Sequence, residues 1–306
     1  VFSSNFELYV DISRRVMTTL QTMVPLIEKY SIDEAFLDLS KIPDGEIEAF
    51  CYELQQRVQK WTGIPISIGV SRTKTLAKVA NTYAKEGCGL FNLLEEREIE
   101  GFLACLPISD VWGIGRKYAA YLRSKNIETA LQLKRVPLKW IRQKMNVIGE
   151  RIVWELNRQI AYPIEKQESS KKTILVSRTF KDPFSSFEDL ASFVSALIEK
   201  AAEKLRKEKR LATYVHIFIK TNRFHRESYY AKRHVVMLDV ASNDTLILHR
   251  AAQIGLRKIF SFGPKYKRIG VCLSGLVEPS CLQYSLFNLS SLQQEGLTAT
   301  IDQINE

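Results

Sequence analysis

The sequence predicts an α+β protein of more than one domain, and three observations support this prediction. A chain of 306 residues is longer than one small hydrophobic core usually organises. Stretches with helical periodicity alternate with stretches of strand periodicity. Positive charge is concentrated in one segment, because Lys171 to Leu276 holds 21 Lys and Arg against 9 Asp and Glu, whereas the remainder holds 23 against 25. Such a segment is expected of a polyanion-binding domain, although a solvated basic surface is the alternative.

The composition argues against several classes of protein. No apolar run is as long as a membrane span and no signal-peptide pattern opens the chain, so we expect a cytoplasmic protein without a membrane partner. The five cysteines form no CxxC pair and the four histidines lack metal-ligand spacing, which argues against a zinc site. The chain begins with Val1 rather than Met, and we expect an amino-terminal truncation.

The amino-terminal part alternates helical and strand-like patterns. Apolar residues recur at helical spacing on both sides of a short acidic stretch. Between Ile64 and Val70, apolar and small residues alternate as they do in a strand. Helices are expected over residues 5–26, 46–61 and 73–85. This alternation is typical of an α+β or α/β arrangement.

Two adjacent acids, Asp33 and Glu34, stand between mostly apolar stretches, Leu26 to Ile32 and Ala35 to Leu39. We expect little water there, and unpaired buried carboxylates are costly, so a bound cation such as Mg²⁺ is the simplest remedy. A regular strand would send the two side chains to opposite faces, so a shared metal site requires a tight hairpin or bulge. The alternative is an ordinary turn with solvated acids. Asp38 is expected to be structural.

Three lysines of the helix expected over residues 73–85 recur four and seven residues apart. This spacing places Lys74, Lys78 and Lys85 on one helix face. A solvated face is the alternative interpretation.

A pair of glycines marks the next segment. Gly113 and Gly115 in Val111–Arg116 are followed by apolar residues at helical spacing, a pattern similar to a helix–hairpin–helix. Glycines let the backbone approach a ligand closely, and the next helix offers free N–H groups to a phosphate. A plain glycine turn is the alternative. A further helix is expected over residues 138–156.

The carboxyl-terminal half begins with a polar linker over residues 159–172. The order β-α-β-β-α-β then follows, which is ferredoxin-like. The expected strands are 173–180, 213–221, 228–238 and 266–273, and the expected helices are 187–207 and 244–259. The tail from residue 277 to 306 lacks a core pattern and is expected to be flexible.

The string Ser-Ile-Asp-Glu-Ala-Phe at residues 31–36 resembles the second catalytic motif of the Y-family, or translesion, DNA polymerases. The opening Phe2–Tyr9 and the stretch Val111–Gly115 resemble the UmuC-like branch of that family. The resemblance runs from Val1 to about Leu276.

The resemblance implies a set of domains. They are a palm over residues 1–93 that lacks its amino-terminal strand and most of the fingers, a small all-α helix–hairpin–helix thumb over 94–158, a linker over 159–172, a little-finger domain over 173–276 and a tail over 277–306.

The resemblance also implies roles for single residues. Asp33 would bridge two Mg²⁺ ions and Glu34 would bind the catalytic one, while the family's third carboxylate is absent from this chain. Lys85 would contact the incoming triphosphate, although Glu86-Gly87 follows it where the family often has Pro. Duplex DNA would be bound by Gly113, Gly115, Arg116 and Arg178, and the sliding clamp by Gln283, Leu286 and Phe287.

The function implied is template-directed, error-prone translesion DNA synthesis in the SOS response to DNA damage. The expected partners are primer–template DNA, deoxynucleoside triphosphates, the bacterial sliding clamp and a UmuD-type regulatory subunit. We expect the full-length gene product to be the enzyme and this chain alone to be inactive. A non-catalytic DNA-binding or repair scaffold is the alternative, and a nuclease would need more acids around Asp33 and Glu34 than the sequence offers.

Overall fold

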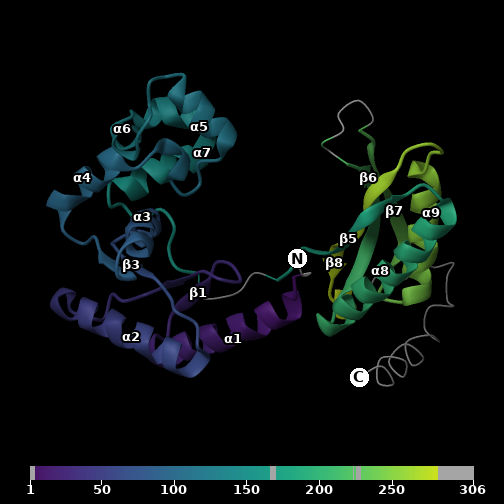
Figure 1. The fold of residues 1–306 in the computed structure, drawn as a ribbon, viewed down its shortest axis with the longest axis horizontal. Coiled ribbons are helices and arrows are strands. Elements are labelled where there is room, and N and C mark those ends of the chain that lie inside the picture. The colour runs from purple at the N-terminus through teal and green to yellow at the C-terminus, as the bar shows by residue number, and fades with distance from the viewer. Residues whose placement is uncertain (1–3, 166–169, 223, 225–228, 282–306) are drawn as a thin grey trace. The chain divides into compact units, whose positions relative to one another are not determined.

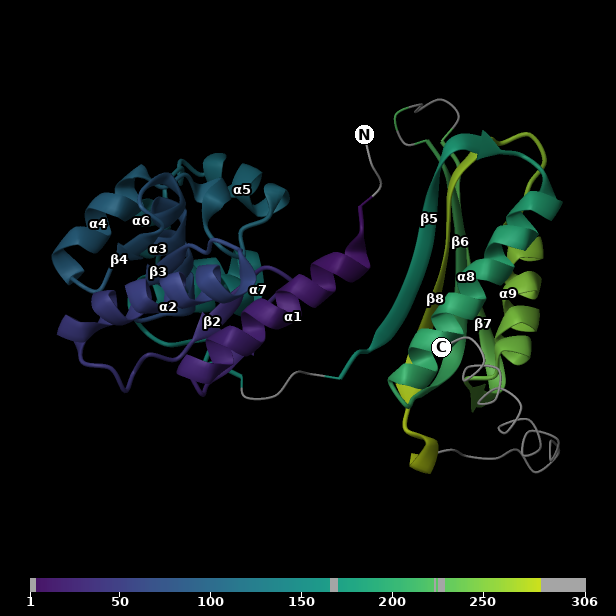
Figure 2. The same ribbon diagram turned by 60° about the horizontal axis from the view of Figure 1, so that its bottom comes forward.

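The computed structural model describes residues 4–165, 170–222, 224 and 229–281. The chain divides into two compact units, Val1–Glu168 and Ser169–Glu306 (Figures 1 and 2). The division falls inside the segment that the sequence predicts to be a linker. In the described part of the chain no helix is long and apolar enough to cross a membrane.

The first unit opens with a helix, a hairpin and a second helix. α1 (Phe6–Met23) leads into an antiparallel hairpin of β1 (Ile27–Lys29) and β2 (Ala35–Leu37), and α2 (Ile47–Thr62) follows. α1 and α2 bury one stripe each against the hairpin, through side chains such as Leu20 of α1. The predicted hairpin is therefore confirmed, and the acidic pair lies where its chain reverses.

A parallel pair of strands, joined by a helix, follows α2 in the chain. β3 (Ile68–Val70) and β4 (Leu90–Asn92) pair in parallel, and α3 (Lys74–Glu86) is the crossover between them. Thr73 caps α3, because its hydroxyl accepts the N–H of Leu76. The predicted helix over residues 73–85 is confirmed, whereas β3 is shorter than expected and the sequence analysis did not identify β4.

Four helices form the rest of the first unit: α4 (Glu96–Cys105), α5 (Arg116–Arg123), α6 (Ala130–Lys134) and α7 (Leu138–Leu156). Short 3-10 turns lie at Asp44–Glu46 and Ile108–Asp110. α7 is broken at Asn146, whose φ of 59° and ψ of −165° are not helical. These helices share one hydrophobic core with the inner face of α3, so α3 packs against the acidic hairpin on one side and the helical set on the other.

The second unit is a four-stranded antiparallel sheet with two helices. Its elements are β5 (Thr173–Phe184), α8 (Phe187–Lys207), β6 (Leu211–Thr221), β7 (Ala231–Ser242), α9 (Thr245–Ile259) and β8 (Tyr266–Val277). The predicted β-α-β-β-α-β order is confirmed. The strands pair in the order β5-β8-β6-β7, so each helical crossover skips one strand.

Both helices cover the same face of this sheet (Figure 2). Apolar side chains of all four strands and of the inner stripes of α8 and α9 form the core between them. Among the described residues no helix covers the opposite face, which is called the open face here. The tail prediction needs a correction at its start, because β8 continues to Val277 and a 3-10 turn follows at Pro279–Cys281.

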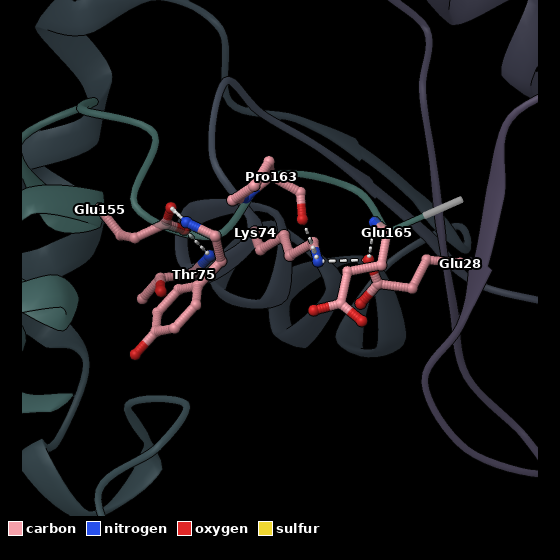
Figure 3. A network of polar contacts seen from close by, with 7 residues as sticks. Glu28, Lys74, Thr75, Glu155, Pro163 and Glu165 are labelled. Atoms are coloured by element: carbon pink, nitrogen blue, oxygen red, sulfur yellow. Dashed lines mark hydrogen bonds and ion pairs between the residues drawn. The ribbon is translucent and has the colours of Figure 1, made fainter. Parts of the chain in front are cut away.

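The first half of the predicted linker is hydrogen-bonded to the first unit (Figure 3). Lys74 of α3 forms an ion pair with Glu28 of β1 at 2.5 Å and donates to the Pro163 carbonyl at 3.0 Å. The N–H of Glu165 donates to the same Glu28 carboxylate at 2.6 Å. Lys74 is only 8% exposed, so separating it from Glu28 would leave a charge in a nearly dry site.

A second carboxylate holds the same segment from the other side. Glu155 of α7 is fully buried, and its Oε1 accepts the N–H groups of Ala161 and Tyr162 at 2.8 and 3.0 Å. Its Oε2 accepts the N–H of Thr75 at 2.9 Å, in the first turn of α3 (Figure 3). A carboxylate at a helix N-terminus also interacts favourably with the helix dipole.

Glu155→Ala should destabilise the first unit by about 3 kcal/mol, because the buried N–H of Thr75 and the half-buried N–H groups of Ala161 and Tyr162 lose their acceptor. Chemical denaturation followed by circular dichroism measures this. The control is Glu53→Ala, which removes an exposed ion pair with Arg57 and should leave the free energy of unfolding nearly unchanged. Equal effects of the two substitutions would contradict the role given to Glu155.

Candidate active site

The acidic pair lies in the turn that joins β1 and β2. The backbone N–H groups of Tyr30 and Ser31 both donate to the Glu34 carbonyl at 3.0 Å, which closes the turn. The Ser31 hydroxyl donates to Asp33 Oδ1 at 2.6 Å. Glu34 is half-buried but Asp33 is exposed, so the expectation that little water surrounds the pair is wrong for Asp33. Tyr30 and Ile32, the apolar residues just before the pair, are themselves exposed and do not shield Asp33 from solvent.

Two lysines of α3 point at the hairpin. Lys78 forms an ion pair with Glu34 Oε1 at 2.5 Å, and its ammonium lies 5.8 Å from the centre of the Tyr30 ring. One turn earlier, Lys74 pairs with Glu28 and lies 5.1 Å from the Phe36 ring. Spacing of four residues therefore places both lysines on one face, as predicted. This face is packed against the hairpin and is not the solvated surface that was the alternative interpretation.

The acids of the turn suit a divalent cation. Mg²⁺ is usually held by one or two carboxylates together with substrate phosphates and water, and Asp33 and Glu34 are two such ligands on adjacent residues. The Lys78 ammonium on Glu34 shows that this position already attracts positive charge. Within the described ranges, no group of three or more His, Cys, Asp and Glu side chains is placed to hold a metal. Asp38 serves the hairpin end, where hydrogen bonds from Ser40 hold the pKa of its carboxyl below the usual range.

Lys85 lies near the end of α3, on the same face as Lys78. Its side chain is exposed, and it forms no ion pair in the part of the chain that the structure describes. Lys85 therefore lies about two helical turns beyond Lys78 along this face, where α3 is open to solvent.

The glycine loop precedes α5, as the helix–hairpin–helix pattern predicts. Gly113 has a φ of +89°, and a Cβ there would lie 2.9 Å from Ile152 Cδ1. Gly115 is the N-cap of α5 and has open space where a Cβ would be. Gly115 and Arg116 are both exposed, so the first N–H groups of α5 are accessible to a phosphate.

Arg178 lies on β5, at the edge of the sheet in the second unit. It stands opposite Ile269, whose side chain is buried under the helices, so Arg178 belongs to the helix-covered side. Its guanidinium lies 5.9 Å from the rings of Phe180 and Phe193. The structure therefore brings Arg178 to the rim of the helix layer and not to the open face.

The open face carries a basic and aromatic cluster that the sequence analysis did not identify. The Phe218 ring lies where a Cβ of Gly270 would be, so only glycine at 270 lets the ring cross β8. Lys220 and Arg268 lie 5.5 and 5.9 Å from this ring, and Arg233 pairs opposite Phe218 in the register. Alternation along β6 could have indicated Phe218 and Lys220, but the register of β8 is not readable from sequence.

The residues expected to bind the sliding clamp, Gln283, Leu286 and Phe287, lie outside the described residues.

Comparison with known proteins identifies the family. Three descriptions of protein families match: the impB/mucB/samB family over residues 1–82, its helix–hairpin–helix motif over 96–127 and its C-terminal domain over 171–286. The protein UmuC of Salmonella typhimurium is 36% identical over 312 residues, which cover 99% of this chain and 74% of that protein. The chain belongs to the impB/mucB/samB family, the UmuC-like branch of the Y-family DNA polymerases.

More distant relatives and a solved structure agree with this assignment. A protein of Mesorhizobium japonicum named DNA polymerase IV 1 is 31% identical over 227 residues, which cover 73% of this chain and 51% of that protein. A Y-family DNA polymerase chimera, Dbh-Dpo4(243-245)-Dbh, has the same fold with a TM-score of 0.72 and 20% identity, over 90% of this chain and 78% of that one.

The family matches cover most of the candidate site of this UmuC-like chain. The match over residues 1–82 contains Asp33, Glu34 and Lys78, but ends before Lys85. The match over 96–127 contains the glycine loop, and the match over 171–286 contains the open face. The elements around the acidic turn and the glycine loop are thus those of the polymerase family.

The two glycines of the loop should respond differently to a methyl group. Gly113→Ala should cost about 1 to 3 kcal/mol of stability, because alanine is strained at a φ of +89°. Gly115→Ala should cost less than this, because the site is open, its φ is −81° and only the better N-cap preference of glycine is lost, and it should weaken duplex binding by crowding the first N–H groups of α5. Thermal unfolding and fluorescence anisotropy with labelled duplex measure the two effects. A loss of stability in Gly115→Ala as large as that in Gly113→Ala, or full duplex affinity in Gly115→Ala, would contradict this division.

Proposed function

We propose that the intact protein carries out error-prone, template-directed translesion DNA synthesis by two-metal nucleotidyl transfer. The observation that carries this proposal is the placement of Asp33 and Glu34 at a solvent-accessible turn, backed by the lysine face of α3, in a chain of this family. A solvated turn would not require the buried Lys74 and the half-buried Lys78 behind it, and a scaffold protein would not require adjacent acids at this turn.

Asp33 and Glu34 would hold the two Mg²⁺ ions, with Asp33 between both and Glu34 on the catalytic one. Bound there, the ions would activate the primer 3′-hydroxyl and stabilise the leaving pyrophosphate. The residues around the turn hold the two carboxylates in position. The backbone N–H groups of Tyr30 and Ser31 on the Glu34 carbonyl fix the turn, and Lys78 orients the Glu34 side chain. The Ser31 hydroxyl restricts Asp33 in the same way.

Lys85 would neutralise charge on the incoming triphosphate. A lysine presents a compact charge with rotatable donors, which suits a phosphate contact that changes during the reaction. Its exposure near the end of α3, beyond Lys78, supports this assignment.

Duplex DNA would be bound without reading its sequence. The glycine loop with Gly115 and Arg116 presents backbone N–H groups, which contact phosphates and carry no base preference. The open face of the second unit would provide a second contact through Lys220, Arg233 and Arg268. The role that the family resemblance suggests for Arg178 would then be limited to phosphates that reach the rim of the helix layer.

Two further partners and the biological setting are proposed from the family resemblance alone. They are a UmuD-type regulatory subunit, the SOS response as the setting, and the bacterial sliding clamp bound by Gln283, Leu286 and Phe287. The cytoplasm is the compartment expected for an enzyme acting on bacterial DNA.

In the intact protein, Asp33→Asn or Glu34→Gln should abolish primer extension and leave duplex affinity nearly unchanged, because a lost metal ligand affects the transition state. The matched control is Asp38→Asn, a nearby carboxylate that accepts from Ser40 in the hairpin end. Gel-based extension and anisotropy titration are the measurements. Near wild-type extension by either site variant would exclude the assignment.

Charge removal on the open face should reduce the salt dependence of duplex binding. Lys220→Ala should lower the slope of log K against log salt by about 1, as expected for one lost phosphate contact. Lys200→Ala, on the exposed side of α8, is the control and should keep the slope. An unchanged slope in Lys220→Ala would move the DNA contact away from this face.

A further inference from the structure

An aromatic joint connects the glycine loop to the acidic hairpin. Trp112, next to Gly113 in the loop, donates its indole N–H to the Tyr30 hydroxyl at 3.1 Å. Its ring also packs edge-on against Tyr30 and Phe36, with centroids 5.5 and 5.7 Å apart. Tyr162 covers another side of the indole at 5.6 Å. The Trp112 side chain thus contacts the turn at Tyr30, the second strand of the hairpin at Phe36 and the docked linker at Tyr162.

Tyr30 is connected to Glu34 in two ways. Its backbone N–H donates to the Glu34 carbonyl at 3.0 Å. Its ring lies 5.8 Å from the Lys78 ammonium, and that ammonium pairs with the Glu34 carboxylate. A shift of the tyrosine therefore changes both the turn and the cation that orients the carboxylate.

We propose that Tyr30 and Trp112 are positioning residues, through which duplex bound at the glycine loop orders the Asp33–Glu34 hairpin for metal. Tyr30 is 48% exposed and Glu34 is only half-buried, so packing alone leaves this turn with freedom that the indole contact restrains. Contiguous contacts of this kind transmit order between two sites only when both ends bias the same element, which here is the hairpin. This inference rests on the proposed function, because it assumes that the loop binds DNA.

Hydrogen exchange tests the proposal without metal or catalysis. The intact protein is compared free and saturated with primer–template in the presence of a chelator. Duplex should slow exchange of the Tyr30 and Ser31 amides in the wild type. Trp112→Phe and Tyr30→Phe should each reduce that protection roughly threefold to tenfold, the range for one lost hydrogen bond, while duplex affinity stays within about twofold.

The control is Trp140→Phe, in the same helical set, where the ring stacks on Tyr121 at 6.3 Å and, among the described residues, makes no ring contact or hydrogen bond with the hairpin. It should keep full protection. Two conservative variants at opposite ends of one hydrogen bond keep the test decisive even if one of them folds poorly. Absence of hairpin protection in the wild type with duplex bound, or full protection in both variants, would overturn the proposal.

Steady-state kinetics provides a second readout. Both variants should lower kcat with little change in KM for nucleotide, and the double variant should be no worse than either single one, because both remove the same contact. Additive losses would overturn the proposal. Failure of the proposed function is distinguishable, since it would appear as absent duplex binding or as primer extension that survives Asp33→Asn.

Discussion

The ion pair between Lys74 and Glu28 is the contact on which the rest of the first unit depends. Lys74 is nearly buried, so neither charge can be left unpaired without a large cost in free energy. The pair ties α3 to the first strand of the hairpin, and the Pro163 carbonyl and the Glu165 N–H complete it from the linker. With α3 fixed in this way, Lys78 lies one turn further along at the height of the acidic turn.

The charged side chains of this structure fall into two classes, buried and exposed. Buried charges such as Glu155 are fully satisfied by N–H groups and determine how the backbone runs. Exposed charges, among them Asp33, Lys85 and the two arginines of the open face, are left available to ligands. Glu34 lies between the two classes, because it is held by Lys78 and still reaches the accessible side of the turn. A site for a highly charged substrate needs both a rigid frame and uncommitted charge.

The sequence predicted the elements better than their pairing. The helix over 187–207 matches the structure because its apolar periodicity is long and regular, and the helix over 138–156 has the predicted bounds but is broken at Asn146, which the pattern did not indicate. The hairpin around Asp33 and Glu34 also matched. The order β5-β8-β6-β7 and the contact between Phe218 and Gly270 depend on long-range register, which local patterns do not contain. A glutamate in an amphipathic helix is usually assigned to solvent, so the buried role of Glu155 had no local signal.

We propose the acidic turn as the metal site of the polymerase. Anomalous scattering from Mn²⁺ in crystals of the intact protein with primer–template and an incoming nucleotide tests it most directly. We expect two peaks about 4 Å apart. One should contact Asp33 and the nucleotide but not Glu34, and the other should contact both Asp33 and Glu34. Peaks that contact neither carboxylate, in a complex with duplex and nucleotide in place, would contradict it.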